Sequence, residues 1–290
     1  MHPAPSLIAF TTLSGLGFGL MAWLGAGSVH GGRLVAAAFV LLALGLAGAG
    51  LLASLLHLGQ PRRFLKAFRE WRSSWLSREA WAACATMAAF ALYGLLWVLD
   101  LRIAALGWLV AALATATVFC TAMIYAQMRS VPRWRSPLTP AIFLLAALAG
   151  GALLADAVAP ARVLLAALAA AQVADWIRGD RALARSGTSL ATATGLGRLG
   201  ALRSFAPPHT GENYLTREMG FVLARRHAGP LRAIGLTLAA LLPLALASLL
   251  PFGHAVGGVA VLSHVAGVAV LRWLFFAEAE HVVGLYYGRR

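Results

Sequence analysis

Long apolar runs separated by short polar connections dominate the chain, and their lengths predict its secondary structure. Because a helix rises about 1.5 Å per residue, about 20 apolar residues cross a hydrocarbon core about 30 Å thick. Eight runs reach or approach that length: residues 6–24, 34–56, 80–99, 103–126, 140–155, 162–177, 231–250 and 255–276. Strands of a membrane barrel would alternate apolar and polar positions, whereas these runs are continuously apolar. The pattern predicts an all-α polytopic membrane bundle of eight transmembrane helices, in one integral membrane domain covering residues 1–290.

Composition agrees with a location in the bilayer. Hydrophobic residues make up 60% of the chain and charged residues only 12%, whereas a soluble protein carries about 25% charged residues. The formal net charge of +14 would ordinarily suggest a nucleic-acid partner. Here the basic residues lie in connections between apolar helices, so a membrane surface or a partner protein is the better explanation.

Basic residues are distributed very unevenly between the two ends of the predicted bundle. The connections after the first, third, fifth and seventh helices hold only Arg33, Arg102 and Arg162, out of 24 lysines and arginines. The other 21 follow the second, fourth and sixth helices or lie towards the end of the chain. Basic residues in short loops resist translocation, which predicts that this face is cytoplasmic. Eight helices then place both termini on the same, cytoplasmic side of a bacterial inner membrane.

Two polar connections on the basic face stand out. Residues 57–79 read HLGQPRRFLKAFREWRSSWLSRE and predict a polar cap on one face of the bundle, where a proton-coupled cofactor could meet water and a partner protein could dock. Residues 179–229 form a connection too long for a simple helix hairpin. Its aromatic and charged residues at 213–221 favour an ordered docking surface, and a disordered linker is the alternative.

Four segments carry a resemblance to a known family. They are MHPAPSLIAFTTLSGLGFGL at the start, the 57–79 segment, IYAQMRSVPRW at 124–134 and ENYLTREMGFVLARRHA at 212–228. Together, and in this order, they resemble the membrane anchor of dimethyl sulfoxide reductases, the DmsC family. The resemblance implies a complex of three subunits. A molybdopterin subunit performs the substrate chemistry, a ferredoxin-like subunit holds [4Fe–4S] clusters, and the anchor exchanges electrons with ubiquinone or menaquinone and binds no haem.

The basic face distinguishes two branches of this family. The best-known branch holds its catalytic subunit outside the cytoplasmic membrane, on a face poor in basic residues. Here the corresponding face is strongly basic, so the chain is more similar to the anchors of sulfite dehydrogenases, whose catalytic subunits stay in the cytoplasm and pass electrons from sulfite to quinone. The alternatives are a quinol-oxidising anchor of a DMSO reductase-type terminal reductase, a transporter, and a passive anchor.

Two residues are the candidate catalytic groups. His57 follows the second helix, an imidazole titrates near neutrality, and the resemblance assigns it to quinone binding; a helix C-terminal cap is the alternative. Glu79 is expected to open the third helix, with Ser77 able to cap it. A carboxylate at this depth suggests a proton relay, and a helix N-terminal carboxylate paired with an arginine explains it equally well.

The other candidates form two groups on the basic face. Trp71 and Trp75, four residues apart, could pack on a quinone ring or anchor the interface. The full set of expected quinone-binding residues is His57, Arg62, Trp71, Arg72, Trp75, Arg78, Glu79, Tyr125 and Arg129. The expected docking residues are Arg63, Lys66, Arg69, Arg217 and Glu218. Haem is not expected, because bis-histidine ligation needs two facing histidines and His264 is the only one clearly deep in a predicted helix; no other metal site is expected either.

Overall fold

The computed structural model describes residues 3–56, 60–206, 211 and 227–287, and the regular elements of these residues are all helices. The long ones are α1 (Pro5–Gly25), α2 (Arg33–Leu55), α3 (Trp75–Val98), α4 (Ala104–Ala126), α5 (Leu138–Leu154), α6 (Val158–Gly179), the continuous segment Ala228–Leu249, and α13 (His254–Ala277). Seven of the described helices are long and apolar enough to cross a membrane, and α5 is a shorter apolar helix of 17 residues. The predicted polytopic helix bundle is confirmed.

Short helices occupy the polar connections. They are η1 (Pro61–Phe68), α7 (Ala182–Arg185), α8 (Leu190–Thr194), η2 (Leu196–Leu199) and η4 (Val282–Tyr287). The segment Ala228–Leu249 consists of α11 (Ala228–Leu236), a π-helical turn η3 (Thr237–Leu241) and α12 (Leu242–Leu249). Pro243 follows this turn, and a proline has no N–H to donate within a regular helix.

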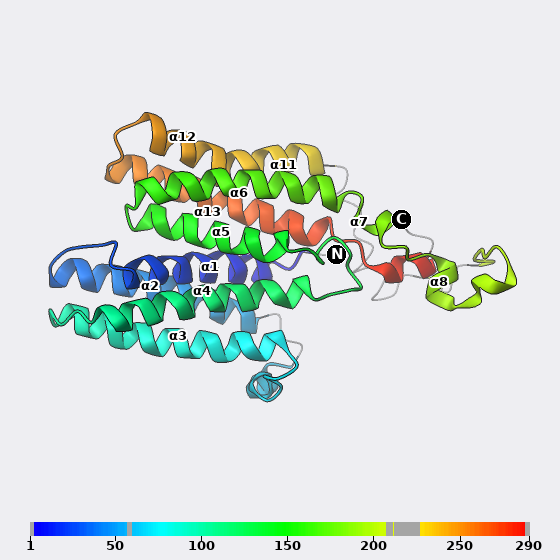
Figure 1. Ribbon diagram of the computed structural model, residues 1–290, viewed down its shortest axis with the longest axis horizontal. Coiled ribbons are helices and arrows are strands. Elements are labelled where there is room, and N and C mark those ends of the chain that lie inside the picture. The colour runs from blue at the N-terminus through cyan, green and yellow to red at the C-terminus, as the bar shows by residue number, and fades with distance from the viewer. Residues whose placement is uncertain (1–2, 57–59, 207–210, 212–226, 288–290) are drawn as a thin grey trace.

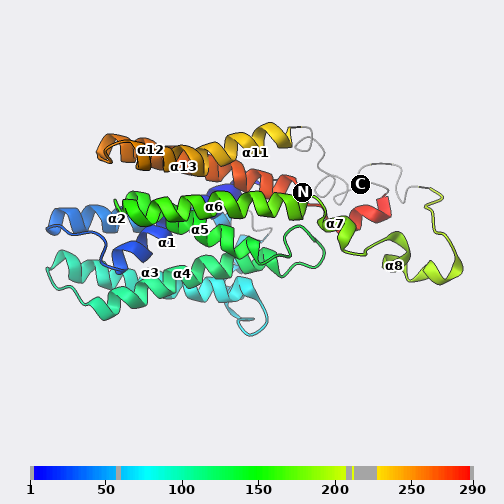
Figure 2. The ribbon, with the colours of Figure 1, turned by 45° about the horizontal axis from the view of Figure 1, so that its top comes forward.

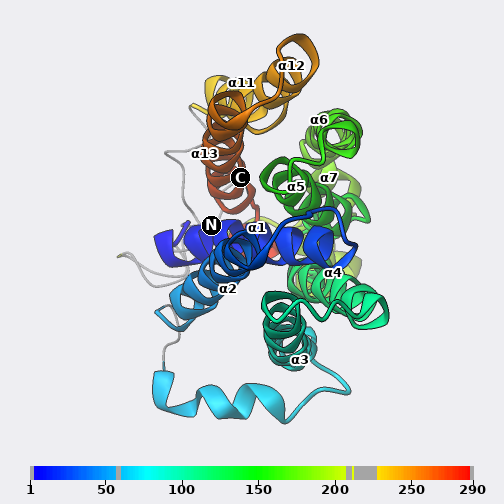
Figure 3. The same ribbon diagram turned by 90° about the vertical axis from the view of Figure 1, so that its left-hand side faces the viewer.

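Helix α1 runs through the centre of the bundle, as the view along the helices shows (Figure 3). It packs against α2, α4, α5 and α13. Small residues allow the close contact with α5: a Cβ on Gly19 would lie 1.8 Å from the carbonyl oxygen of Ala147. Any side chain at Gly19 would therefore push the two helices apart, which makes this glycine a requirement of the packing.

The polar connections gather at one end of the bundle. The element η1, the lobe containing α7 and α8, and both chain ends lie there (Figures 1 and 2). The 179–229 connection contains three short helices in its described part, and Tyr286 of η4 donates a hydrogen bond of 3.0 Å to the carbonyl of Ala193 in α8. Its 213–221 segment lies outside the described residues.

The third helix begins earlier than the sequence pattern predicts. It starts at Trp75, with Ser74 as the extended N-cap residue, and not near residue 80. Glu79 therefore lies inside the helix and not at its opening. Ser77 is not the cap either, because it lies in the first turn and donates its hydroxyl proton to the carbonyl of Ala67 in η1.

Candidate functional site

An apolar chamber lies between α2 and α3 at the basic end of the bundle. Its volume is about 640 Å³, within the range of about 300–1,000 Å³ that is typical of small-molecule pockets. Phe10 of α1 closes its inner side. Leu52 and Leu55 of α2 and Leu76 of α3 line it and are exposed. The chamber therefore opens towards the surface that lipid would cover.

The element η1 forms the wall of the chamber at the polar end. Gln60, Arg63, Phe64, Ala67 and Phe68 line this wall. Two hydrogen bonds to backbone carbonyls hold it on α3, one from Ser77 to Ala67 and one of 3.0 Å from the Trp81 indole to Phe68. The Phe68 and Trp81 rings also meet edge to face, with centroids 5.3 Å apart. A short amphipathic helix placed in this way separates the chamber from the polar end of the bundle.

Glu79 is the acidic group of the chamber. It lines the chamber from the second turn of α3, and its side chain is only 6% exposed. Thr121 of α4 donates a hydrogen bond to its carboxylate. A buried carboxylate is costly in an apolar setting unless it is compensated. This one hydroxyl donor compensates it only in part, and no basic side chain in the described part of the chain forms an ion pair with it.

Arg78 does not pair with its neighbour Glu79. Its guanidinium donates instead to the carbonyls of Trp71 (3.0 Å) and Arg72 (2.7 Å) and lies over the Trp75 ring, 4.4 Å from its centroid. The interpretation of Glu79 as a helix-terminal carboxylate held by an arginine is therefore wrong. Arg78 has a different role: it closes the turn that leads from η1 into α3.

The two tryptophans expected to share a face have separate neighbours. Trp75 begins α3 and meets Phe119 of α4 edge to face at 5.8 Å, whereas Trp71 precedes the helix and is 54% exposed. Trp71 lines a shallow groove with Arg78 and Trp81, next to the chamber and not inside it. Neither ring lines the chamber.

Tyr125 and Arg129 do not form the expected pair. Helix α4 ends at Ala126, so Arg129 lies beyond it and is exposed. Tyr125 is buried in an aromatic cluster, with its ring centroid 5.3 Å from Trp134, 5.4 Å from Phe275 and 5.5 Å from Phe276. Its spacing from Arg129 suggested one helical face, but the helix ends between the two residues.

The basic residues of the first polar connection are mostly exposed. Arg63 lines the chamber, although the sequence placed it among the docking residues. Apart from Arg78, described above, the other four lie on the surface, outside the chamber: Arg62, Lys66, Arg69 and Arg72. Three further predicted residues, His57, Arg217 and Glu218, lie outside the described residues.

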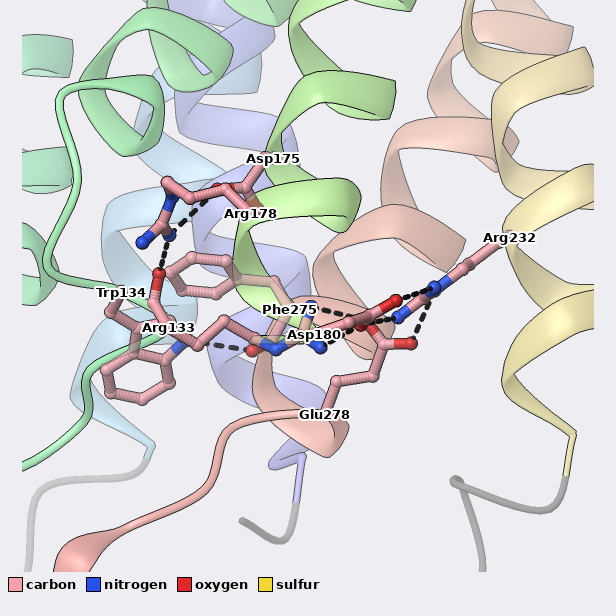
Figure 4. A network of polar contacts seen from close by, with 8 residues as sticks. All are labelled: Arg133, Trp134, Asp175, Arg178, Asp180, Arg232, Phe275 and Glu278. Atoms are coloured by element: carbon pink, nitrogen blue, oxygen red, sulfur yellow. Dashed lines mark hydrogen bonds and ion pairs between the residues drawn. The ribbon is translucent and has the colours of Figure 1, made fainter. Parts of the chain in front are cut away.

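A network of ion pairs joins the ends of other helices on the same face (Figure 4). Asp180, just after α6, receives hydrogen bonds of 2.5 Å each from Arg133 and Arg232, and Arg232 also donates to Glu278 at 2.7 Å. The hydrogen bonds from Arg232, together with those from Arg133, lower the pKa of the Asp180 carboxyl to about 2. These carboxylates are fully paired, unlike Glu79.

The described residues contain no cluster of histidine, cysteine and acidic side chains suited to a metal ion. His264, the histidine deep in α13, has its Nδ1 2.6 Å from the carbonyl oxygen of Ala239 and its Nε2 3.0 Å from that of Ala146. In this arrangement both ring nitrogens already face carbonyl oxygens. The side chain joins α5, η3 and α13.

These features define a polytopic membrane protein with an acid-lined apolar chamber at one end. Its sequence matches the DMSO reductase anchor subunit (DmsC) family over residues 1–277. The chain therefore belongs to this family, which confirms the resemblance seen in the sequence.

Two relatives represent the two branches considered above. One is the sulfite dehydrogenase subunit designated C of Allochromatium vinosum, to which the chain is 32% identical over 99% of both chains. The other is the anaerobic dimethyl sulfoxide reductase chain YnfH of Escherichia coli, to which it is 34% identical over 39% of this chain and 41% of that one.

Proposed function

We propose that the chain is the quinone-reactive membrane anchor of a molybdopterin oxidoreductase. The observation that carries this proposal is the chamber, which is open on its lipid side and has one buried acid, Glu79, in its wall. Quinone reduction needs an apolar space for the ring and a group that transfers protons to the ring oxygens. The chamber wall supplies both. Electrons come from a [4Fe–4S] cluster of a ferredoxin-like partner subunit, and the molybdopterin subunit lies beyond it.

The relatives and the charge asymmetry support one electron direction. The sulfite dehydrogenase relative aligns along 99% of the chain, whereas the reductase relative aligns along 39% of it. The basic connections favour a cytoplasmic catalytic partner. We therefore assign the oxidative direction, from sulfite to membrane quinone. A reporter fused within residues 179–229 should be active only as a cytoplasmic fusion; periplasmic activity would support the terminal-reductase alternative.

Substitution of the acid tests the quinone site directly. Glu79→Gln keeps the size and polarity of the side chain but removes its proton transfer. In the purified complex of all three subunits it should lower the rate of quinone reduction about 100-fold, the loss typical of a positioned acid or base. Glu70→Gln is the matched control, because Glu70 lies in the same polar connection but is exposed and does not line the chamber.

His57 extends the same test to a residue outside the described part of the chain. His57→Gln should also lower quinone turnover while the complex still assembles and still oxidises sulfite with an artificial soluble acceptor. If both variants reduce quinone at the wild-type rate in an assembled complex, the chain is a passive anchor and the proposed site is wrong.

A further inference from the structure

Two small cavities with polar groups in their walls lie inside the bundle. The first lies among α1, α4, α5 and α13, and about 20 Å³ of it is open to the centre of a water molecule. The second lies among α5, α6 and α13, with about 30 Å³ open in the same sense. A cavity needs about 10–15 Å³ by this measure to hold one water, provided that polar groups surround it. Both cavities are therefore large enough for water.

The first cavity is bordered by polar atoms that lack a protein partner. The hydroxyl oxygen of Thr12 and the Nε of Arg272 are both buried and have no hydrogen-bond partner in the described part of the chain. Arg272 is only 5% exposed, and its guanidinium carbon lies 3.3 Å from the centroid of the Phe143 ring. An unsatisfied buried donor or acceptor is costly, so each of these groups favours a bound water.

Thr121 connects the first cavity to the acid of the chamber. Its side chain lines the cavity, and its hydroxyl donates to the Glu79 carboxylate. Glu79 therefore faces the chamber on one side and reaches this cavity through Thr121 on the other. When a quinone ring fills the chamber, only the second side is still open to water.

The two cavities meet at Arg272 and lead to the basic end. Both are lined by Phe143, Ala146, Val268 and Arg272. The second cavity is also lined by Asp175 and Glu278. Glu278 is held by Arg232 in the ion-pair network, whose Asp180 side chain is 47% exposed and meets water (Figure 4). The cavities thus extend from Thr121, which bonds to Glu79, to the buried carboxylates Asp175 and Glu278, and Arg232 links Glu278 to the partly exposed Asp180.

From this placement we infer that the two cavities bind ordered water and form the route by which Glu79 exchanges protons with the basic face. Arg272 is a positioning residue in this route. A guanidinium carries only donors and keeps its proton, so it can hold the oxygens of waters on both sides but cannot relay a proton itself. The protons move along the waters from the basic face, past Asp175 and Glu278, to Glu79.

The inference rests on the proposed function and completes its proton balance. Reduction of one quinone to quinol takes two protons and two electrons, and the partner subunit's cluster would deliver these electrons one at a time, being re-reduced between the two transfers. Each proton that Glu79 gives to a ring oxygen is replaced through the water of the first cavity. In the oxidative direction, the route takes up two protons from the basic face for each quinol formed.

Thr12→Val is the sharpest test, because it has the same shape but lacks the hydroxyl. Thr12 has no protein partner for its hydroxyl among the described residues, so a purely structural role predicts no loss. We expect about a tenfold slower quinone reduction by the complex, which corresponds to one lost water-orienting hydrogen bond. We also expect a larger solvent deuterium isotope effect and an unchanged KM for decylubiquinone. Thr115→Val is the matched control, since Thr115 bonds within α4 and lines neither cavity.

A second variant blocks the route by volume. Val268→Leu adds one methylene, about the size of a water, at a position shared by both cavities, and it should slow quinone reduction as Thr12→Val does. If both variants turn over like the wild type while Glu79→Gln is slow, the route is wrong and the quinone site stands. If Glu79→Gln itself is normal, the proposed function fails first.

Direct imaging gives a readout that does not depend on turnover. A cryo-electron microscopy map of the complex, at a resolution that shows waters, should contain ordered water in both cavities, and in Thr12→Val the water next to residue 12 should be lost. Cavities without water would overturn the inference. A halide at Arg272, with turnover that depends on halide concentration, would overturn it as well.

Discussion

The chamber and the ion-pair network lie at the same end of the bundle, but they hold their carboxylates in opposite ways. Glu79 is buried with one hydroxyl donor, from Thr121. Asp180 and Glu278 are each held by both Arg133 and Arg232. A carboxylate paired with two guanidiniums is held in its charged form and helps to hold helices together. A buried carboxylate with few partners is costly to keep charged and is therefore a candidate for proton transfer. The two regions should therefore respond differently to substitution.

The largest expected effect comes from filling the chamber. Cys84 of α3 lines it and is exposed, so Cys84→Trp should place an indole where the quinone ring binds. We expect the Kd for decylubiquinone to rise about 100-fold, or about 2.7 kcal/mol, with little change in the stability of the bundle. Binding titrations on the purified complex would measure this.

The matched control for the chamber is a tryptophan on the same helix that does not reach it. Leu92 is an exposed residue of α3 outside the chamber lining, so Leu92→Trp should bind quinone like the wild type. Equal affinities for the two variants would show that quinone binds elsewhere. The chamber would then have no binding role to contrast with the ion-pair network.

Removal of an arginine from the network should have the opposite effect. Arg232→Met leaves Asp180 and Glu278 with Arg133 alone, so the free energy of unfolding should fall by about 2 kcal/mol, less than for a fully buried pair because water reaches Asp180. Quinone affinity should not change. Unfolding in mixed detergent micelles would measure the loss; wild-type stability would show that the network is only a surface feature.

Sequence pattern predicted the bundle well because a membrane fixes helix length and loop charge locally. Continuous apolar runs could be counted against the thickness of the bilayer, and 21 of 24 basic residues could be assigned to one face from their order alone. The start of α3 was missed because the polar residues Ser77, Arg78 and Glu79 lie in its first turns and end the apolar run on which the prediction was based. That error of about one turn placed Glu79 at the boundary, whereas it is buried against α4.

The two cavities inside the bundle could not be predicted, because their walls are formed by helices that are far apart in the chain. Arg272 was counted with the basic residues near the end of the chain, but it lies inside α13 and packs on Phe143 of α5. A charged residue within an apolar run was the available signal. Nothing in the sequence distinguishes Thr12 from the other threonines of apolar runs, since only helix rotation decides which of them borders a cavity.

The hydrogen bond that fixes η1 should have a smaller effect, and it lies on the chamber side of the comparison. Ser77→Ala removes the donor to Ala67 and should lower the free energy of unfolding by about 1 kcal/mol. Because η1 carries one wall of the chamber, we also expect weaker quinone binding. Ser263→Ala, which removes a hydroxyl bonded to the carbonyl of Leu238 and does not line the chamber, is the control. A stability loss in Ser77→Ala without any change in affinity would show that the chamber does not need this wall.

The smallest expected effect is the acid sensitivity of the network. The pKa of Asp180 is lowered to about 2 by Arg232 and Arg133, whereas an unfolded aspartate has a pKa of about 3.9. A lowered pKa in the folded state means that the ion pairs stabilise the fold above about pH 4 and that this contribution is lost as the pH falls towards 2. Because Asp180 is partly exposed, the loss should stay below about 1 kcal/mol.

Thermal unfolding at pH 5 and pH 3 should show a smaller difference for Asp180→Asn than for the wild type. Asp156→Asn is the control, because Asp156 makes no ion pair among the described residues and has a positive φ of 55°, which an asparagine tolerates. An identical pH dependence in all three proteins would mean that acid acts on other carboxylates. The ion pairs of Asp180 would then make no measurable contribution to the stability of this end of the bundle.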